Sequence, residues 1–109
     1  MLKYNSGNKE FIIMTKEYIL GFLTNNKQLL KEKYNVTKIG LFGSYARDEA
    51  LETSDIDLAI ETSKKDFFIK SDLQYFLEDS FDTKIDIGYL DSMREFYRRR
   101  IGKEILYAR

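Results

Sequence analysis

The stretch that decides the fold is GLFGSYARDEALETSDIDLAIE, residues 40–61. Its last part, DIDLAIE, alternates between polar and apolar residues, and this alternation predicts a β-strand. The apolar side chains on one face are Ile56, Leu58 and Ile60, and the other face carries Asp55, Asp57, Ala59 and Glu61. Burying carboxylates costs free energy unless a cationic group compensates their charge. The two aspartates are therefore candidate functional residues.

Three further elements are predicted around this strand. Apolar residues recur with helical spacing from about residue 15 to 33, which predicts one amphipathic helix. VTKIGLFG, residues 36–43, is short and β-prone and predicts a strand that ends at Gly43. After the central stretch, Ser63 and Asp66 resemble the start of a helix that continues through the next apolar stripe.

The C-terminal third of the chain predicts a strand and a last helix. TKIDIGYL, residues 83–90, is the third strand candidate, and Asp86 points away from its core-facing isoleucines. Ser92 and Glu95 have the spacing of a capping box, which predicts a helix start. The order of elements predicts an α/β (α+β) fold, in which a small mixed β-sheet of three or four strands is flanked by helices.

Length and composition limit the classes of protein that the chain can represent. A length of 109 residues predicts one domain, over residues 11–109. Residues 1–10, MLKYNSGNKE, are polar and predict a tail. Lysine plus arginine and aspartate plus glutamate number 18 each, so no net charge attracts nucleic acid, and generic DNA binding is not expected. No apolar run reaches the roughly 20 residues of a membrane span, which predicts a cytoplasmic protein.

The absence of histidine and cysteine removes the usual zinc ligands and the commonest general base, so any catalysis must depend on carboxylates, lysine, arginine, tyrosine, serine or threonine. Side chains on one face of a strand lie about 7 Å apart, so Asp55 and Asp57 can converge on one or two divalent cations. Asp86 on a neighbouring strand can add a third carboxylate, and hard oxygen ligands suit Mg²⁺ bound with a nucleotide phosphate. The alternative is that these aspartates are ordinary edge or solvent-facing residues.

Gly43 and Ser44 also allow two interpretations. A glycine–serine pair after a strand is usually a turn. If a short helix begins at Ser44, its free N–H groups and its dipole attract anionic oxygens, and the glycine lets a phosphate approach closely.

FGSYAR followed by SDIDLAI, with ten residues between Ser44 and Asp55, resembles the signature of the polymerase-beta-like nucleotidyltransferase superfamily. It is most similar to the minimal branch, the MNT domains. The resemblance extends from about residue 36 to the terminal IGKEILYAR. The combination is specific, whereas each piece alone is a weak signal.

The resemblance implies roles for the three acids. Asp55 and Asp57 would coordinate Mg²⁺, and Asp86 matches the third acid, which helps to bind the catalytic metal and draws the proton from the attacking hydroxyl. The implied reaction is in-line attack by a hydroxyl on the α-phosphorus of a nucleoside triphosphate, with two Mg²⁺ ions and with pyrophosphate as the leaving group.

The resemblance also implies a phosphate site. Gly43 and Ser44 would hold the triphosphate. Arg47 matches the family arginine, for which phosphate contact and a structural ion pair both remain open. One departure is that Asp48 stands where many members have glycine, which adds a negative charge near the proposed phosphate site.

Minimal nucleotidyltransferases are frequently encoded beside HEPN-domain proteins as antitoxin and toxin. The resemblance therefore implies that the chain transfers AMP from ATP to a hydroxyl acceptor, a tyrosine of a partner HEPN toxin. A second interpretation is a binding module that neutralises its partner by contact alone. A third is nucleotidyl transfer to RNA, based on the cationic segment REFYRRRIGKEILYAR, residues 94–109, which also fits a solvated helix face.

Overall fold

The three predicted strands form three of the four strands of a sheet in the computed structural model, which describes residues 2–5 and 9–109. They are β3 (Val36–Phe42), β4 (Ile56–Thr62) and β5 (Ile85–Tyr89), and the short β6 (Leu106–Tyr107) is the fourth. The order across the sheet is β5-β4-β3-β6. β4 and β5 are parallel, whereas β3 is antiparallel to both of its neighbours. The predicted fold class, a small mixed sheet flanked by helices, is therefore confirmed.

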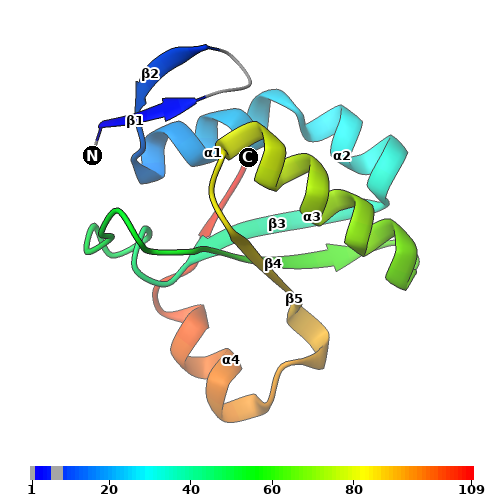
Figure 1. The fold of residues 1–109 in the computed structure, drawn as a ribbon. Helices are drawn as coiled ribbons and strands as arrows, with labels where there is room; N and C mark the ends of the chain where they lie inside the picture. Colours follow the sequence, from blue (N-terminus) through cyan, green and yellow to red (C-terminus); the bar gives the residue numbers. More distant parts are fainter. Residues whose placement is uncertain (1, 6–8) are drawn as a thin grey trace.

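Helices cover the two faces of this sheet unequally (Figure 1). α1 (Lys16–Asn25), α2 (Lys27–Tyr34) and α3 (Phe67–Phe81) lie together on one face. A 3₁₀ turn, η1 (Leu90–Ser92), and the short α4 (Glu95–Gly102) lie on the other. This arrangement leaves part of the second face open.

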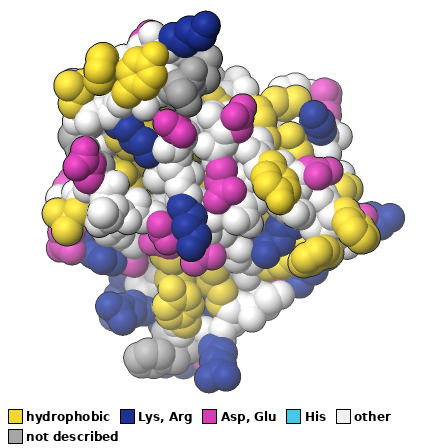
Figure 2. Space-filling view, in the orientation of Figure 1, with side chains coloured by type: hydrophobic (Ala, Val, Ile, Leu, Met, Phe, Trp, Pro, Cys, Tyr) yellow, Lys and Arg dark blue, Asp and Glu magenta, His cyan; other side chains and the backbone are white. Residues whose placement is uncertain are grey.

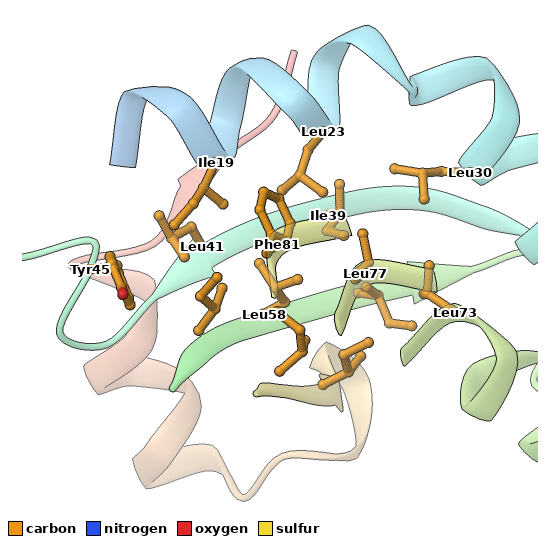
Figure 3. Packing of buried hydrophobic residues seen from close by; sticks show 14 of the residues in the cluster. Ile19, Leu23, Leu30, Ile39, Leu41, Tyr45, Leu58, Leu73, Leu77 and Phe81 are labelled. Carbon is orange, nitrogen blue, oxygen red and sulfur yellow. The ribbon is translucent and has the colours of Figure 1, made fainter. Parts of the chain in front are cut away.

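The main core lies between the sheet and α1, α2 and α3 (Figure 3). It contains the apolar face that the alternation of β4 predicts, and its innermost side chains are fully buried: Ile19, Leu23, Leu41, Leu58, Leu73, Leu77 and Phe81. Burial of one such side chain contributes about 1.5–3 kcal/mol. The core therefore fixes which face of β4 turns inward, and with it the direction of the aspartates.

A second, smaller core covers part of the opposite face. Phe42 of β3, Ala59 of β4 and Ile101 of α4 are buried together there, and Met93 packs against them. Because Asp57 and Ala59 are two residues apart on one strand, Asp57 lies on the same face, just beyond the part that α4 covers.

The predicted single helix over residues 15–33 is wrong in one respect, because the chain forms two helices that meet at Asn26. The Asn26 side chain donates a hydrogen bond of 2.8 Å to the Phe22 carbonyl oxygen, and its backbone leaves the helical conformation at φ −106° and ψ 16°. Asparagine offers the backbone such local alternatives to a helix.

The predicted polar tail is also wrong for the described part of residues 1–10. β1 (Leu2–Asn5) and β2 (Glu10–Ile13) form an antiparallel hairpin, while residues 1 and 6–8 lie outside the described residues. The buried Asn5 amide donates to the Ser80 carbonyl oxygen at 2.8 Å, and the Lys3 ammonium bonds to the Thr83 hydroxyl, so the hairpin is tied to the end of α3. Figure 2 shows hydrophobic side chains exposed over β1 and β2.

Both predicted helix starts lie a few residues too early. α3 begins at Phe67, and Asp66 is itself the cap, accepting hydrogen bonds from the N–H groups of the first turn at 2.9 and 3.1 Å. Ser92 lies in η1, and α4 begins at Glu95 without a side-chain cap. Within the two described ranges, no helix has the length and hydropathy needed to cross a membrane.

Candidate active site

Two of the predicted acids are direct neighbours in the sheet. Asp57 of β4 and Asp86 of β5 are register partners in the parallel pair, so their backbones lie one strand spacing apart, about 4.8 Å. Asp57 is half-buried and Asp86 is exposed. Asp55 directly precedes β4 and is partly buried. The strand pairing thus brings the three predicted acids to one end of β4 and β5.

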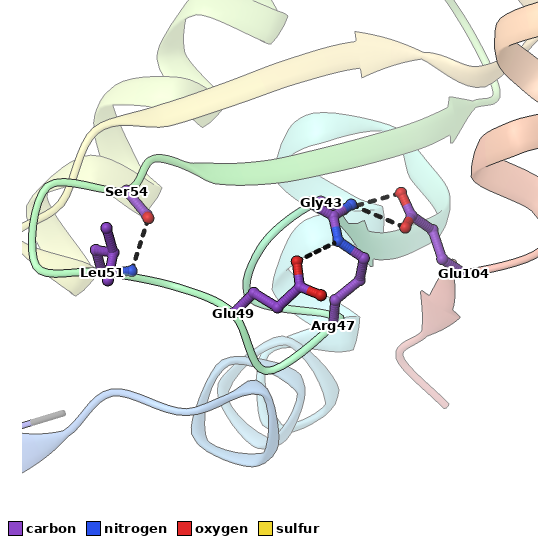
Figure 4. Close-up of polar contacts among 6 residues, drawn as sticks. All are labelled: Gly43, Arg47, Glu49, Leu51, Ser54 and Glu104. Atoms are coloured by element: carbon purple, nitrogen blue, oxygen red, sulfur yellow. Dashed lines mark hydrogen bonds and ion pairs between the residues drawn. The ribbon is translucent and has the colours of Figure 1, made fainter.

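The loop that leads into β4 is closed by its own hydrogen bonds. The Leu51 N–H donates to the Ser54 hydroxyl at 2.8 Å, and the Ser54 N–H donates back to the Leu51 carbonyl oxygen at 3.0 Å (Figure 4). This turn immediately precedes Asp55. It therefore fixes the path along which the chain enters the acidic end of β4.

The electrostatic environment of Asp57 is unfavourable to its charge. The pKa of this carboxyl is raised from 3.8 to about 6. Burial is the largest cause, and repulsion by Asp86 and then by Asp55 also contributes. Arg47 acts in the opposite direction but compensates only part of the effect. A cation that binds beside such a carboxylate stabilises its charged form.

The donor chemistry of these acids fits a hard divalent cation such as Mg²⁺, because carboxylate oxygens are its preferred protein ligands. The side chains are not gathered into a finished site, however. Among the residues that the structure describes, no three acids, histidines or cysteines lie close enough together to hold an ion. The assignment of Asp55, Asp57 and Asp86 as metal ligands therefore stays a prediction, which requires their side chains to rotate towards a common point.

Gly43 lies directly beside this acidic end, and only glycine fits there. Its φ is +78°, and a Cβ atom on it would lie 2.2 Å from the Asp57 Oδ2 atom. Residues with side chains rarely adopt such a positive φ. The turn after β3 and the carboxylate of Asp57 therefore touch, which joins the two halves of the stretch 40–61 in space.

The short helix considered at Ser44 is not formed. Residues 43–49 make tight turns instead, in which the N–H groups of Arg47, Asp48 and Glu49 donate to the carbonyl oxygens of Gly43, Tyr45 and Ser44 at 3.2, 3.2 and 2.9 Å. None of these three bonds uses the N–H of Ser44. The argument from a helix dipole is lost, whereas the close approach that Gly43 permits remains.

Arg47 forms the structural ion pair that was one of its two predicted roles. Its Nη1 lies 2.9 Å from Glu104 Oε2, and its Nε lies 3.1 Å from Glu49 Oε2 (Figure 4). Hydrogen bonds to these carboxylates, Glu104 first, raise the pKa of Arg47. Phosphate contact, the other role, remains a prediction, and the guanidinium also faces the cavity described below.

Asp48 does not add its charge to the phosphate site. Its φ is +58°, a conformation that glycine adopts readily and that aspartate tolerates better than most other residues. Its carboxylate pairs with Lys16 of α1 at 2.7 Å and lines a separate hollow with Thr15 and Tyr45. The departure from the family pattern is therefore neutralised locally.

A cavity of about 290 Å³ lies beside Asp57, and Gly43, Ser44 and Arg47 also line it, whereas Asp55 and Asp86 lie outside its lining. β3 and the following turn contribute one wall, and α4 with the residues after it contributes the other; the lining is Phe42, Gly43, Ser44, Arg47, Asp57, Tyr97, Arg100, Ile101 and Glu104. Two larger cavities, of about 370 Å³ near Val36 and about 510 Å³ near Asp72, contain none of the predicted site residues in their linings. The smaller cavity is therefore the candidate active site.

Five of its lining residues were not predicted as site residues: the apolar Phe42 and Ile101, and the polar Tyr97, Arg100 and Glu104. The three polar residues are the ones that can take part in binding or chemistry. Their signal is helical spacing, because residues 97, 100 and 104 recur at intervals of three and four and so share one side of the α4 region. The sequence analysis assigned this segment to a solvated face or to RNA. Only the position of α4 over the sheet shows that this side turns towards Asp57.

Comparisons with known proteins show which family the chain belongs to. The model of the nucleotidyltransferase domain family matches residues 23–107. A Methanocaldococcus jannaschii protein named "Putative protein adenylyltransferase MJ1217" is 37% identical over 95 residues, which cover 85% of this chain and 97% of the relative. The protein adenylyltransferase MntA of Thermococcus cleftensis is 31% identical over 97 residues, with 88% and 98% coverage.

Solved structures show the same fold. A crystal structure of a toxin–antitoxin with AMP-PNP superimposes with a TM-score of 0.67 at 24% identity and covers 79% of this chain and 72% of the matched chain. A complex of a tri-AMPylated HEPN toxin with an MNT antitoxin from Shewanella oneidensis gives a TM-score of 0.60 at 22% identity, with 83% and 71% coverage. With the extent of the family match and the identity to the curated relatives, the chain belongs to the nucleotidyltransferase domain family, among its minimal MntA-like members, and is a nucleotidyltransferase.

Proposed function

We propose that this protein transfers AMP from ATP to a tyrosine hydroxyl of a HEPN-domain toxin and thereby acts as its antitoxin. The relatives with 31–37% identity are named protein adenylyltransferases, which supports transfer of AMP to a protein. A related fold was crystallised with AMP-PNP, an analogue of ATP, and another with an AMPylated HEPN toxin. The observation that carries the proposal is the contact of Gly43 with Asp57 in one cavity, which places a close-approach turn beside an acidic strand end.

The reaction that fits this site is displacement at the α-phosphorus. The acceptor oxygen forms a new bond to that phosphorus, the bond to the bridging oxygen breaks, and pyrophosphate leaves with the electron pair. The hydroxyl proton passes to a carboxylate, for which we assign Asp86, because it is exposed at the end of β5 and is the register partner of Asp57.

The other residues would bind and orient the nucleotide. Gly43 gives the phosphates close access to the backbone, and Ser44 and Arg47 supply donors within the cavity. Asp55, Asp57 and Asp86 would hold Mg²⁺, as two ions. When bound, Mg²⁺ would neutralise the charge that develops on the phosphate oxygens. Burial and the neighbouring Asp86 and Asp55 disfavour the charged form of Asp57 and so raise its pKa. A cation bound beside Asp57 would compensate this, which is the reason to expect one there.

The test is transfer of radiolabel from α-labelled ATP to a purified HEPN-domain protein encoded by the adjacent gene. The expected result is labelling of a tyrosine by the wild-type protein and none by Asp86→Asn, with binding of the HEPN protein retained in both. Asp82→Asn is the matched control, because Asp82 has a φ of +50°, which asparagine accepts, and is not one of the predicted site residues. It should label as the wild type does.

Neutralisation of the toxin by the wild type without any label, and equally by Asp86→Asn, would show that contact alone is sufficient. The enzyme assignment for this acceptor would then give way to the binding module.

A further inference from the structure

Glu104 occupies two hydrogen-bond donors of the turn that follows β3. Its Oε2 atom lies 2.9 Å from Arg47 Nη1, and its Oε1 atom accepts from the Gly43 N–H at 3.4 Å (Figure 4). One carboxylate therefore bridges the backbone and the guanidinium. Gly43 and Arg47 both line the cavity in which the proposed function places the phosphates of ATP.

The position of Glu104 is fixed by the end of α4. Its N–H donates to the Ile101 carbonyl oxygen at 2.9 Å, and the N–H of Ile105 donates to the same oxygen at 2.8 Å. Ile101 is fully buried in the smaller core. The backbone of Glu104 is thus anchored, while its side chain, which is 21% exposed, can turn away into the solvent.

The charge of Glu104 is held in place by Arg47 and opposed by Asp57. Glu104 is one of the groups that raise the pKa of Asp57, so the two carboxylates repel each other. A nucleotide phosphate brought into this cavity would meet the same repulsion and would compete for the same two donors. A carboxylate and a phosphate cannot both occupy them.

We propose that Glu104 is an internal substitute for a phosphate group, which holds the Gly43 and Arg47 donors in the empty site and is displaced when the nucleotide binds. This inference rests on the proposed function, since it takes the phosphates of ATP as the displacing ligand. Displacement requires an anion with more charge than the carboxylate it replaces. Glu104 therefore discriminates in favour of pyrophosphate and ATP and against small carboxylates.

The test is calorimetric titration of ATP and of inorganic pyrophosphate, each with Mg²⁺, into the wild type, Glu104→Gln and Glu49→Gln. Glutamine at position 104 has almost the same shape but carries no charge, and its single carbonyl oxygen replaces only one of the two acceptor atoms, so it should release the two donors more easily. We expect Glu104→Gln to bind both ligands roughly threefold to tenfold more tightly. Glu49→Gln is the matched control, because Glu49 also pairs with Arg47 but is 65% exposed and outside the cavity lining, and it should change the affinity less than about twofold.

Weaker or unchanged binding by Glu104→Gln, while the wild type binds ATP, would overturn the inference and leave the proposed function standing. It would mean that Glu104 orients Arg47 for the phosphate instead of occupying its place. No binding of either ligand by any of the three proteins would overturn both. A measurement on the wild type alone adds a check that needs no variant: saturation with pyrophosphate should shift the NMR resonances of the Gly43 amide and the Arg47 side chain, and unmoved resonances at saturation would refute displacement.

Discussion

Asp57→Asn is expected to stabilise the metal-free protein at neutral pH, because the native charge at this position opposes folding. Burial, together with Asp86 and Asp55, raises the pKa of Asp57 from 3.8 to about 6. The folded state therefore binds a proton more tightly than the unfolded state does. By linkage, the free energy of unfolding falls as the pH rises from about 4 to about 6 and stays lowered above that range.

The size of the effect follows from the same shift. A pKa rise from 3.8 to about 6 corresponds to about 3 kcal/mol, since one pKa unit is about 1.36 kcal/mol. Because the carboxyl is only half-buried, solvent screening reduces this to roughly 1–2 kcal/mol. Asparagine has almost the same shape and no charge. The free energy of unfolding of Asp57→Asn should therefore exceed that of the wild type by this amount at about pH 8, and most of the difference should disappear at about pH 4.

Urea unfolding in EDTA at these two pH values measures the difference directly. Asp72→Asn, an exposed substitution in the middle of α3, is the control for a general loss of negative charge and should change stability by less than about 0.5 kcal/mol. An Asp57→Asn protein that is less stable than the wild type at pH 8, or equally stabilised at both pH values, would refute the electrostatic reasoning.

Two further predictions concern the same contact between the turn and the acids. ATP should bind about tenfold more tightly with Mg²⁺ than in EDTA, a difference of about 1.4 kcal/mol, and Asp57→Asn should remove most of this difference. Equal affinities in both buffers, measured by calorimetry, would contradict the metal assignment. Gly43→Ala should cost about 1–3 kcal/mol in urea unfolding and also weaken binding of ATP with Mg²⁺, because its Cβ would lie 2.2 Å from Asp57 Oδ2 at a φ of +78°. Unchanged stability would show that the turn relaxes freely.

The parts of the fold that the sequence predicts well are those where side-chain alternation decides which face is buried. In β4 a shift by one residue would bury Asp57 in the main core and expose Leu58, so only one register is possible. The hairpin of β1 and β2 has no such constraint. Leu2 and Ile13 are each 61% exposed and Phe11 is 67% exposed, so among the apolar residues of the two strands Ile12 alone is buried, and no alternation marks these residues as strands. β6 pairs at only two positions of β3, far away in the sequence.

The same distinction explains the candidate site. The acids were found because a charged residue in an alternating strand is visible locally. Glu104 and Arg100 were not, because their place in the cavity depends on how α4 crosses the sheet, and this depends on Ile101 packing against Phe42 and Ala59. Those three residues are far apart in the sequence. No local pattern connects them.

The arginine run of α4 bears on the choice between a protein acceptor and RNA. Binding to single-stranded RNA requires several cations that are free to follow one backbone, with aromatic rings on which bases stack. Arg99 is instead paired with Glu95 at 2.6 Å within the helix, and Arg100 turns into the cavity beside Asp57, Tyr97 and Glu104. Two of the three arginines in the run are therefore engaged, one in a helix-stabilising pair and one in the lining of the candidate active site. With 18 basic and 18 acidic residues in the whole chain, this division favours a protein acceptor, whose specificity comes from a docked surface, over an RNA acceptor drawn in by charge.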